Sequence, residues 1–140
     1  MKYKNAFILS DNYPSYQRAL HIIGENFRVL SIKASLSTSE WNWVGKAMWN
    51  SHECFSKNYK GSCEAIDELI KHTRDFRKHQ HGLYGAKSIG LGFGGSILVL
   101  IEEKIVEMYL EYISSKYKLS SINFHKCIPS GGSIADHIIE

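Results

Sequence analysis

The stretch Asn5-Ala6-Phe7-Ile8-Leu9-Ser10 is a short apolar run that a turn signal closes at once, and this pattern is typical of a buried strand. Residues 11–14 (Asp-Asn-Tyr-Pro) then predict the start of a helix, because Asp and Asn cap helices and proline is tolerated in the first turn. We expect this helix to end at Gly24 and a second strand to follow over residues 27–36. A strand–helix–strand unit is most often a right-handed parallel crossover, so the opening predicts an α/β fold, with α+β as the alternative.

Further along the chain, helical spacing dominates. A helix starting near Trp41 is preceded by Ser37 and Glu40, which have the spacing of a capping box. A second helix is predicted from about residue 62 to Gly82, with Ile66, Leu69, Ile70, Thr73 and Phe76 inward. Residues 97–117 predict a third helix with a broad apolar face, and residues 121–128 a last strand. We therefore expect one domain, residues 1–140, in which a sheet of about three strands packs with about four helices.

Composition excludes several classes of protein. The chain has 140 residues, 44% of them hydrophobic, and a net charge of +3, which suits a globular domain and is mild for a nucleic-acid binder. The apolar run at the N-terminus is too short for a signal peptide, and no stretch is long enough to predict a membrane span. The three cysteines make an odd count, which favours free thiols in a reducing compartment. A cytoplasmic protein without a membrane segment is expected.

A glycine-rich segment, Gly90-Leu91-Gly92-Phe93-Gly94-Gly95, matches the pattern G-x-G-x-x-G just before the helix predicted from residue 97. Backbone N–H groups at a helix start can hold a phosphate, helped by the helix dipole. The dinucleotide fingerprint also needs a preceding strand and a following strand with an acidic residue. The alternatives are a small enzyme acting on phosphates or nucleotides through Gly90–Gly95, with Asp11 as a candidate carboxylate, or a tight turn.

A basic cluster spans Arg74–His81 near the end of one predicted helix. It could contact phosphates and is the basis of an alternative function, a nucleic-acid-binding module. Cations at a helix C-terminus are equally typical of a solvated helix end. The nearby histidines His72, His79 and His81, with His52 and Cys54 further upstream, do not have the usual spacing of zinc ligands, so no metal site is predicted.

Two features favour protein binding. Glu103, Glu107 and Glu111 stand at i, i+4 and i+8 on the helix predicted over 97–117, and like charges at this spacing destabilise a helix slightly. A row of acidic side chains that destabilises its own helix suggests a role in binding a basic partner. Trp43 is turned away from Trp41 and Trp49 on the same helix, and exposed aromatic side chains often anchor interfaces.

The chain also has no G-x-S-x-G elbow and no cysteine-protease context, so no catalytic residue is predicted. In overall character, it resembles the immunity proteins of bacterial toxin systems such as contact-dependent growth inhibition. The resemblance lies in a small domain rich in Lys, Ile, Asn and Ser with an acidic helix face, and it includes no motif. It implies a non-enzymatic cytoplasmic protein, without a cofactor, that blocks the active site of a cognate toxin domain. Glu103, Glu107, Glu111 and Trp43 would be its binding residues.

Overall fold

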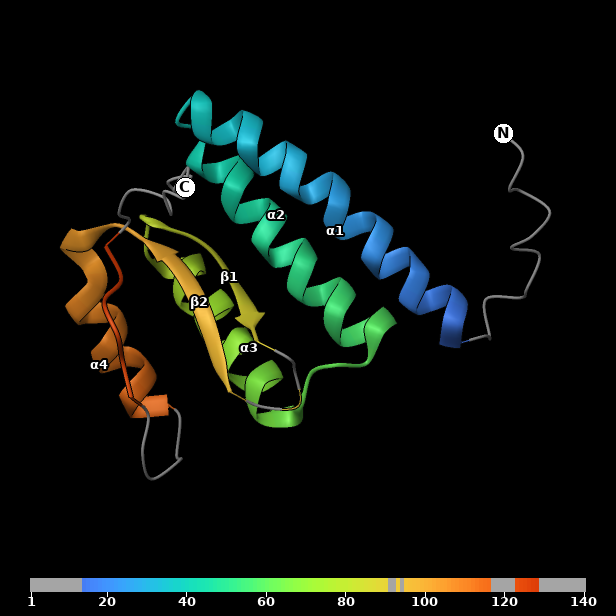
Figure 1. Cartoon of the computed structure of the whole chain (residues 1–140). Helices are drawn as coiled ribbons and strands as arrows, with labels where there is room; N and C mark the ends of the chain where they lie inside the picture. The colour runs from blue at the N-terminus through green and yellow to red at the C-terminus, as the bar shows by residue number, and fades with distance from the viewer. Residues whose placement is uncertain (1–13, 91–92, 94, 117–122, 129–140) are drawn as a thin grey trace, which may run out of the picture.

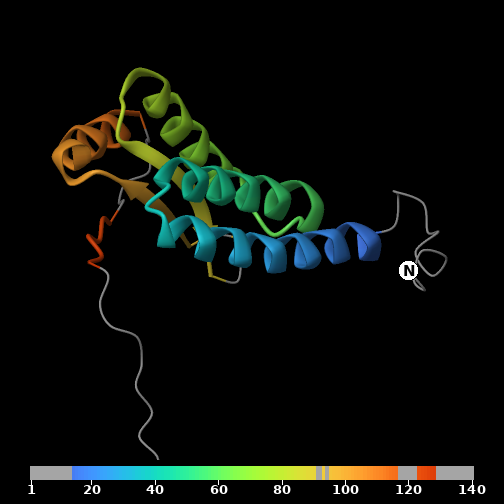
Figure 2. The same ribbon diagram turned by 90° about the horizontal axis from the view of Figure 1, so that it is seen from above.

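The computed structural model describes residues 14–90, 93, 95–116 and 123–128 (Figures 1 and 2). The elements of this part follow in the order α1 (Pro14–Ser37), α2 (Trp41–Cys54), the π-helical turn η1 (Phe55–Tyr59), α3 (Glu64–His79), β1 (Leu83–Ile89), β2 (Ser96–Ile101), the 3-10 turn η2 (Glu103–Ile105) and α4 (Val106–Lys116). The prediction of a small domain mixing helices with a small sheet is confirmed.

The sheet is a single antiparallel hairpin in the described residues. β1 and β2 pair from Leu83 opposite Ile101 to Ile89 opposite Ser96, with an irregularity between Leu83 and Gly85. Figure 1 shows α1 and α2 running side by side, with α2 against β1, while α3 packs on the sheet and on α4. The hairpin therefore lies between two helical layers.

Two glycines allow α2 to approach β1 closely. A Cβ atom added to Gly45 would overlap the carbonyl group of Tyr84, and one added to Gly85 would lie 2.5 Å from the Cα of Gly45. The approach also lets the Trp49 indole N–H donate a hydrogen bond to the Tyr84 carbonyl at 3.0 Å. Helix and strand are thus held backbone against backbone at this point.

The core lies between α3, α4 and the hairpin. Thr73 and Tyr109 are buried in it, and their hydroxyl oxygens lie 2.8 Å apart. Because Thr73 donates to the Leu69 carbonyl, the Tyr109 hydroxyl is the donor in this pair. Burial raises the pKa of Tyr109 to about 12. The buried cluster comprises Trp49, Ile66, Ile70, Phe76, Leu83, Ala86, Ile105, Tyr109 and Ile113.

Several predicted elements are wrong. The strand predicted over residues 27–36 is the second half of α1, which continues through Gly24 to Ser37. The Arg28 guanidinium lies 2.9 Å from where a Gly24 Cβ would be, and Arg28 bonds to Glu25 one turn back, which supports the helix across the glycine. The run 96–101 forms β2 and not the start of a helix, because a continuous apolar run suits either structure.

Neither of the two strands predicted near the ends of the chain is found in the described residues. The strand predicted over residues 5–10 lies outside the described residues, as does Asp11. The strand predicted over residues 121–128 is also wrong, since residues 123–128 adopt no regular secondary structure. Across the described part of the chain, no helix combines the length and the apolar character that crossing a membrane requires.

Candidate functional site

The glycine-rich segment connects the two antiparallel strands. It was predicted to stand at a helix N-terminus, and that prediction is wrong because β2 begins at Ser96. Gly90 and Gly95, at the two ends of the connection, have φ angles of +87° and +108°, which favour glycine strongly. Between them, Phe93 is exposed and its N–H donates to the Gly61 carbonyl at 2.7 Å. Residues 91, 92 and 94 are outside the described part.

A cavity of about 320 Å³ opens beside the start of this connection. It lies where α1, α2 and the end of β1 meet. Its walls combine an acid, a lysine, a histidine and two hydroxyl groups with apolar and backbone surface. The lining residues are His21, Glu25, Ser51, Phe55, Lys87, Ser88, Ile89 and Gly90.

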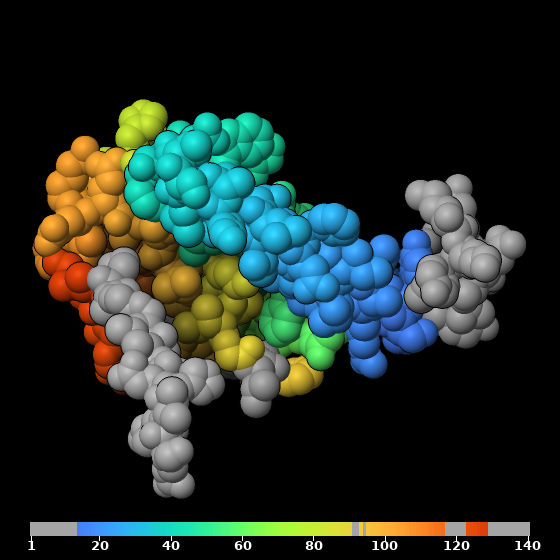
Figure 3. Space-filling model, turned by 45° about the horizontal axis from the view of Figure 1, so that its top comes forward, coloured from blue at the N-terminus to red at the C-terminus, as the bar shows by residue number. Residues whose placement is uncertain are grey.

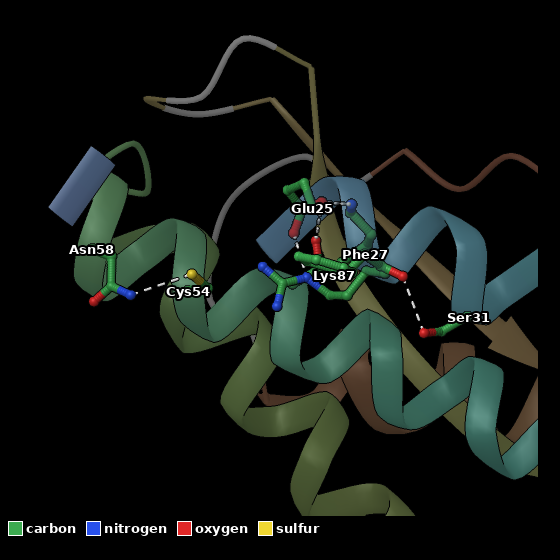
Figure 4. A network of polar contacts seen from close by, with 8 residues as sticks. Glu25, Phe27, Ser31, Cys54, Asn58 and Lys87 are labelled. Carbon is green, nitrogen blue, oxygen red and sulfur yellow. Dashed lines mark hydrogen bonds and ion pairs between the residues drawn. The ribbon is translucent and has the colours of Figure 1, made fainter. Parts of the chain in front are cut away.

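Glu25 is the centre of the polar contacts in this cavity. It accepts hydrogen bonds from Arg28 Nε at 2.6 Å and from Ser51 Oγ at 2.9 Å, and Lys87 Nζ lies 3.4 Å from its Oε2. Figure 4 shows Glu25 and Lys87 pointing toward each other from α1 and β1. Burial alone would raise the pKa of Glu25, but the bonds from Arg28 and Ser51, together with the charge of Lys87, hold it below its ordinary value.

His21 forms another wall of the cavity and is only 7% exposed. Its ring packs against Phe55 and Tyr59, with ring centres 5.6 and 5.2 Å away. Its Nδ1 is buried without a hydrogen-bond partner among the described residues. Desolvation is the main reason that the pKa of His21 lies below its ordinary value, so the ring is neutral at pH 7.

A lower pH is therefore expected to destabilise the protein through His21. Because the pKa of His21 is lower in the folded protein, the unfolded chain binds a proton at a higher pH than the folded protein does. The contribution of neutral His21 to the free energy of unfolding is therefore complete above about pH 6.5 and is lost as pH falls. Urea unfolding at pH 7.5 and pH 5.5 should show a smaller pH effect for His21→Phe than for the original protein. The exposed His81, changed to Gln, is the control, and equal pH effects in all three proteins would contradict the argument.

A second polar chain joins β1, α2 and α3. His52 is 5% exposed, with Nδ1 3.2 Å from Ser88 Oγ and Nε2 3.2 Å from Asp67 Oδ1. Burial lowers the pKa of His52 more than the Asp67 carboxylate raises it. Ser56 and Ser62 also donate to Asp67, at 2.9 and 2.6 Å. Through Ser88, this chain holds the end of β1 close to Gly90.

The site as a whole can bind an anionic or polar ligand. Lys87 supplies a positive charge, Ser51 and Ser88 supply hydroxyl groups, and the glycine connection brings the backbone close to whatever occupies the cavity mouth. Backbone N–H groups in such turns, together with a lysine, are a common environment for phosphate oxygens. The sequence reasoning missed Glu25 and Lys87. The available signals were the i, i+3 spacing of Glu25 and Arg28 and the position of Lys87 just before the glycines.

The residues predicted to bind a partner are dispersed. Glu103 belongs to η2 and pairs with Lys126 at 2.5 Å, whereas Glu107 and Glu111 lie exposed on α4. The predicted acidic stripe on a single helix is therefore interrupted. Trp43 is 57% exposed, with Lys46 over its ring, and belongs to a different helix, α2.

The basic cluster Arg74–His81 is partly used inside the molecule. Arg74 lies over the Trp49 ring at 5.0 Å, and Arg77 Nε donates to the Leu83 carbonyl at 3.1 Å. Lys78 pairs with Asp75 at 2.7 Å. A search of residues 14–90, 93, 95–116 and 123–128 finds no group of three or more His, Cys, Asp or Glu side chains that could hold a metal ion.

Comparison with solved structures defines the class of fold. The structure of Lactococcus lactis galactokinase complexed with galactose matches 81% of this chain with a TM-score of 0.71, at 23% sequence identity. The match covers 29% of the galactokinase chain. The described fold is therefore that of one part of a galactokinase.

Curated relatives point the same way. The chain is 33% identical over 102 residues to the galactokinase of Thermotoga neapolitana, covering 73% of this chain and 28% of that protein. It is 32% identical over 120 residues to that of Thermotoga maritima, covering 83% and 33%, and 28% identical over 102 residues to that of Canis lupus familiaris, covering 73% and 25%. The chain thus spans about a quarter to a third of these relatives. No protein-family model matches it.

These relatives correct the functional prediction. Proteins named as galactokinases are enzymes, so the reading as a non-enzymatic immunity protein that binds a cognate toxin is wrong. Without a toxin partner, no toxin-binding role remains for Glu103, Glu107, Glu111 and Trp43. The alternative of a phosphate- or nucleotide-handling enzyme that uses Gly90–Gly95 agrees better with the comparisons. Overall character misled the prediction because small size, mild charge and the lack of familiar motifs are common to many unrelated proteins.

Proposed function

We propose that this chain forms the part of a galactokinase-type sugar kinase that carries the β1–β2 connection, and that it takes part in phosphoryl transfer from ATP to galactose. The observation that carries the proposal is the agreement of sequence and fold: up to 33% identity with galactokinases over 73% of the chain, and a TM-score of 0.71 with a solved one. The described elements, packed around one core, would act as one folding unit. Use of ATP suits the cytoplasm, where the free Cys54, Cys63 and Cys127 would stay reduced.

In this proposal the connection between β1 and β2 contacts phosphate oxygens. Phosphoryl transfer depends mainly on positioning and on stabilising negative charge. Gly90 and Gly95 let the backbone approach a ligand without Cβ atoms in the way, since the space around both is open. Lys87, two residues before Gly90 in β1, is held by Glu25 at 3.4 Å, a loose contact that leaves its ammonium group able to bind a phosphate as well.

An NMR titration of the full chain with ATP and Mg²⁺ tests this placement. We expect the amide signals of Gly90, Phe93 and Gly95 to shift, with smaller changes across α3 and α4. Galactose is then added to the ATP-saturated protein to see whether signals around the cavity respond. Shifts confined to other regions, or none at millimolar ATP, would count against the proposal.

Lys87→Ala is expected to weaken ATP binding by about tenfold, because a charge-assisted hydrogen bond contributes about 1.5–3 kcal/mol. The fold should persist, since Glu25 keeps its bonds with Arg28 and Ser51. The matched control is Lys87→Arg, which keeps the charge and should bind within about threefold of the original protein. Isothermal titration calorimetry measures the affinity of all three proteins for ATP. Equal affinities would show that Lys87 does not contact ATP.

A further inference from the structure

The buried side of α1 is polar. The side facing α2 and β1 presents Glu25, which bonds to Ser51 and Lys87, and His21, which packs on Phe55 and Tyr59. His21 is the one residue of this 24-residue helix that is buried in the structure. Helices in proteins owe most of their stability to a packed apolar face. Most of the apolar residues of α1 therefore take no part in the packing seen here, and Ile32 on this side is partly buried.

Those apolar residues lie on the outer side. Leu20, Ile23, Phe27 and Leu30 are 43%, 50%, 67% and 65% exposed. Their spacing of three, four and three residues places them within an arc of about 80°, roughly opposite His21 and Glu25. This set is called the α1 stripe below. Figure 3 shows α1 as a blue ridge along the surface of the molecule.

A second exposed apolar row runs along the same helix. Ile22, Val29 and Leu36 are 52%, 63% and 48% exposed, and their spacing of seven places them roughly 140° from the centre of the α1 stripe. A helix with apolar residues on several sides is normally enclosed within a larger protein. One partner helix could cover the stripe or the row, but not both.

A second copy of this chain is thus a poor occupant. Pairing of identical helices is normally specified by charged side chains that flank the seam. The described residues that flank the stripe, Ala19, Asn26 and Ser31, carry no charge. A larger occupant is suggested by the solved galactokinase, where the matching fold makes up only 29% of the chain.

We propose that the α1 stripe is an interface that packs against apolar surface from the remainder of a galactokinase-type fold, whether joined to this chain or supplied by another polypeptide. This inference rests on the proposed function. It adds a location: the contact is made by the outer side of α1, away from the β1–β2 connection. Phe27, the largest and most exposed member of the stripe, is expected to be its centre.

The test compares one substitution in two settings. The whole chain is placed in Thermotoga maritima galactokinase in exchange for the segment that aligns with it, and Phe27→Lys is made in this chimera and in the free chain. In the chimera we expect the thermal midpoint to fall by about 5 °C or more, and in the free chain to change by less than about 2 °C. Ser15→Lys, which adds the same charge at an exposed position on the polar arc shared with Lys33 and outside the stripe, should change neither midpoint by more than about 2 °C.

Small, equal shifts in both settings would overturn the inference. If Phe27→Lys prevents folding of the chimera, Leu30→Ala serves instead, with an expected fall of about 4 °C in the chimera alone. Light scattering of the free chain provides a further check, because a dimer that Phe27→Lys converts to a monomer would identify a second copy as the occupant and overturn the proposal. The midpoints do not depend on catalysis. If Phe27→Lys lowers the thermal midpoint of a chimera that does not phosphorylate galactose, the interface is supported and the proposed function is not. If the chimera is active but its midpoint does not fall, the proposed function is supported and the interface is not.

Discussion

Replacing Gly45 by alanine is expected to destabilise the protein by at least about 2 kcal/mol, although alanine is the better helix former by about 1 kcal/mol. The added Cβ would overlap the Tyr84 carbonyl group, and rigid backbone lies on both sides of the contact because Gly85 faces Gly45. Relief would require α2 to move away from β1, which would lengthen the 3.0 Å bond from Trp49 to Tyr84. Urea unfolding followed by circular dichroism measures the difference.

Gly24→Ala is the matched control, because it is also a glycine inside a helix. Its Cβ would meet the Arg28 guanidinium at 2.9 Å, which is the movable end of a long side chain. We expect its stability to lie within about 1 kcal/mol of the original protein, and an increase is allowed by helix propensity. If Gly45→Ala were as stable as Gly24→Ala, the close contact of α2 with β1 would be wrong.

Replacing Gly95 by valine is expected to lower the galactokinase kcat/KM of the chimera by at least about 100-fold, equivalent to about 2.7 kcal/mol. Among the described residues that are not its chain neighbours, no atom lies within 4 Å of where a Cβ would be added at Gly95, so the expected effect comes from the backbone. A φ of +108° is strongly unfavourable for a β-branched residue, and the connection would have to change shape to relieve it. The backbone N–H groups proposed to contact phosphate would move with it.

Ser96→Ala provides the comparison one residue further on, in the regular backbone of β2. This exposed position should keep kcat/KM within about twofold, since surface substitutions usually have small effects. A thermal midpoint is measured for both variants to confirm that the chimera is folded. Full activity of Gly95→Val in a folded chimera would show that the shape of the connection does not matter for the reaction.

The sequence predicted the middle of the fold well and its start poorly. The helices near residues 41–54 and 64–79 follow from clear apolar spacing. The capping box of Ser37 and Glu40 does not form, since Glu40 is the N-cap of α2 and makes no side-chain bond. In α1 most of the apolar residues face outward, so a rule that places them in the core assigned the wrong structure to residues 27–36.

The candidate site could be predicted only in part. The glycine segment was visible as a motif, but its partners come from α1 and α2, and single-sequence reasoning does not show that Glu25, Ser51 and Lys87 meet. The bond between Glu25 and Lys87 joins residues 62 positions apart. Burial of His21 and His52 was also hidden, because histidine is intermediate between the buried and the exposed residue types. Tertiary contacts define this site more than any local pattern does.

The most direct measurement is ATP- and galactose-dependent formation of ADP by the chimera of this chain with Thermotoga maritima galactokinase. The chain is 32% identical to that enzyme over 120 residues, so the exchange keeps about a third of the aligned residues. We predict phosphorylation of galactose that requires both substrates and is lost with Gly95→Val. A chimera that unfolds cooperatively, and so is folded, yet shows no galactose-dependent ADP formation would contradict the account.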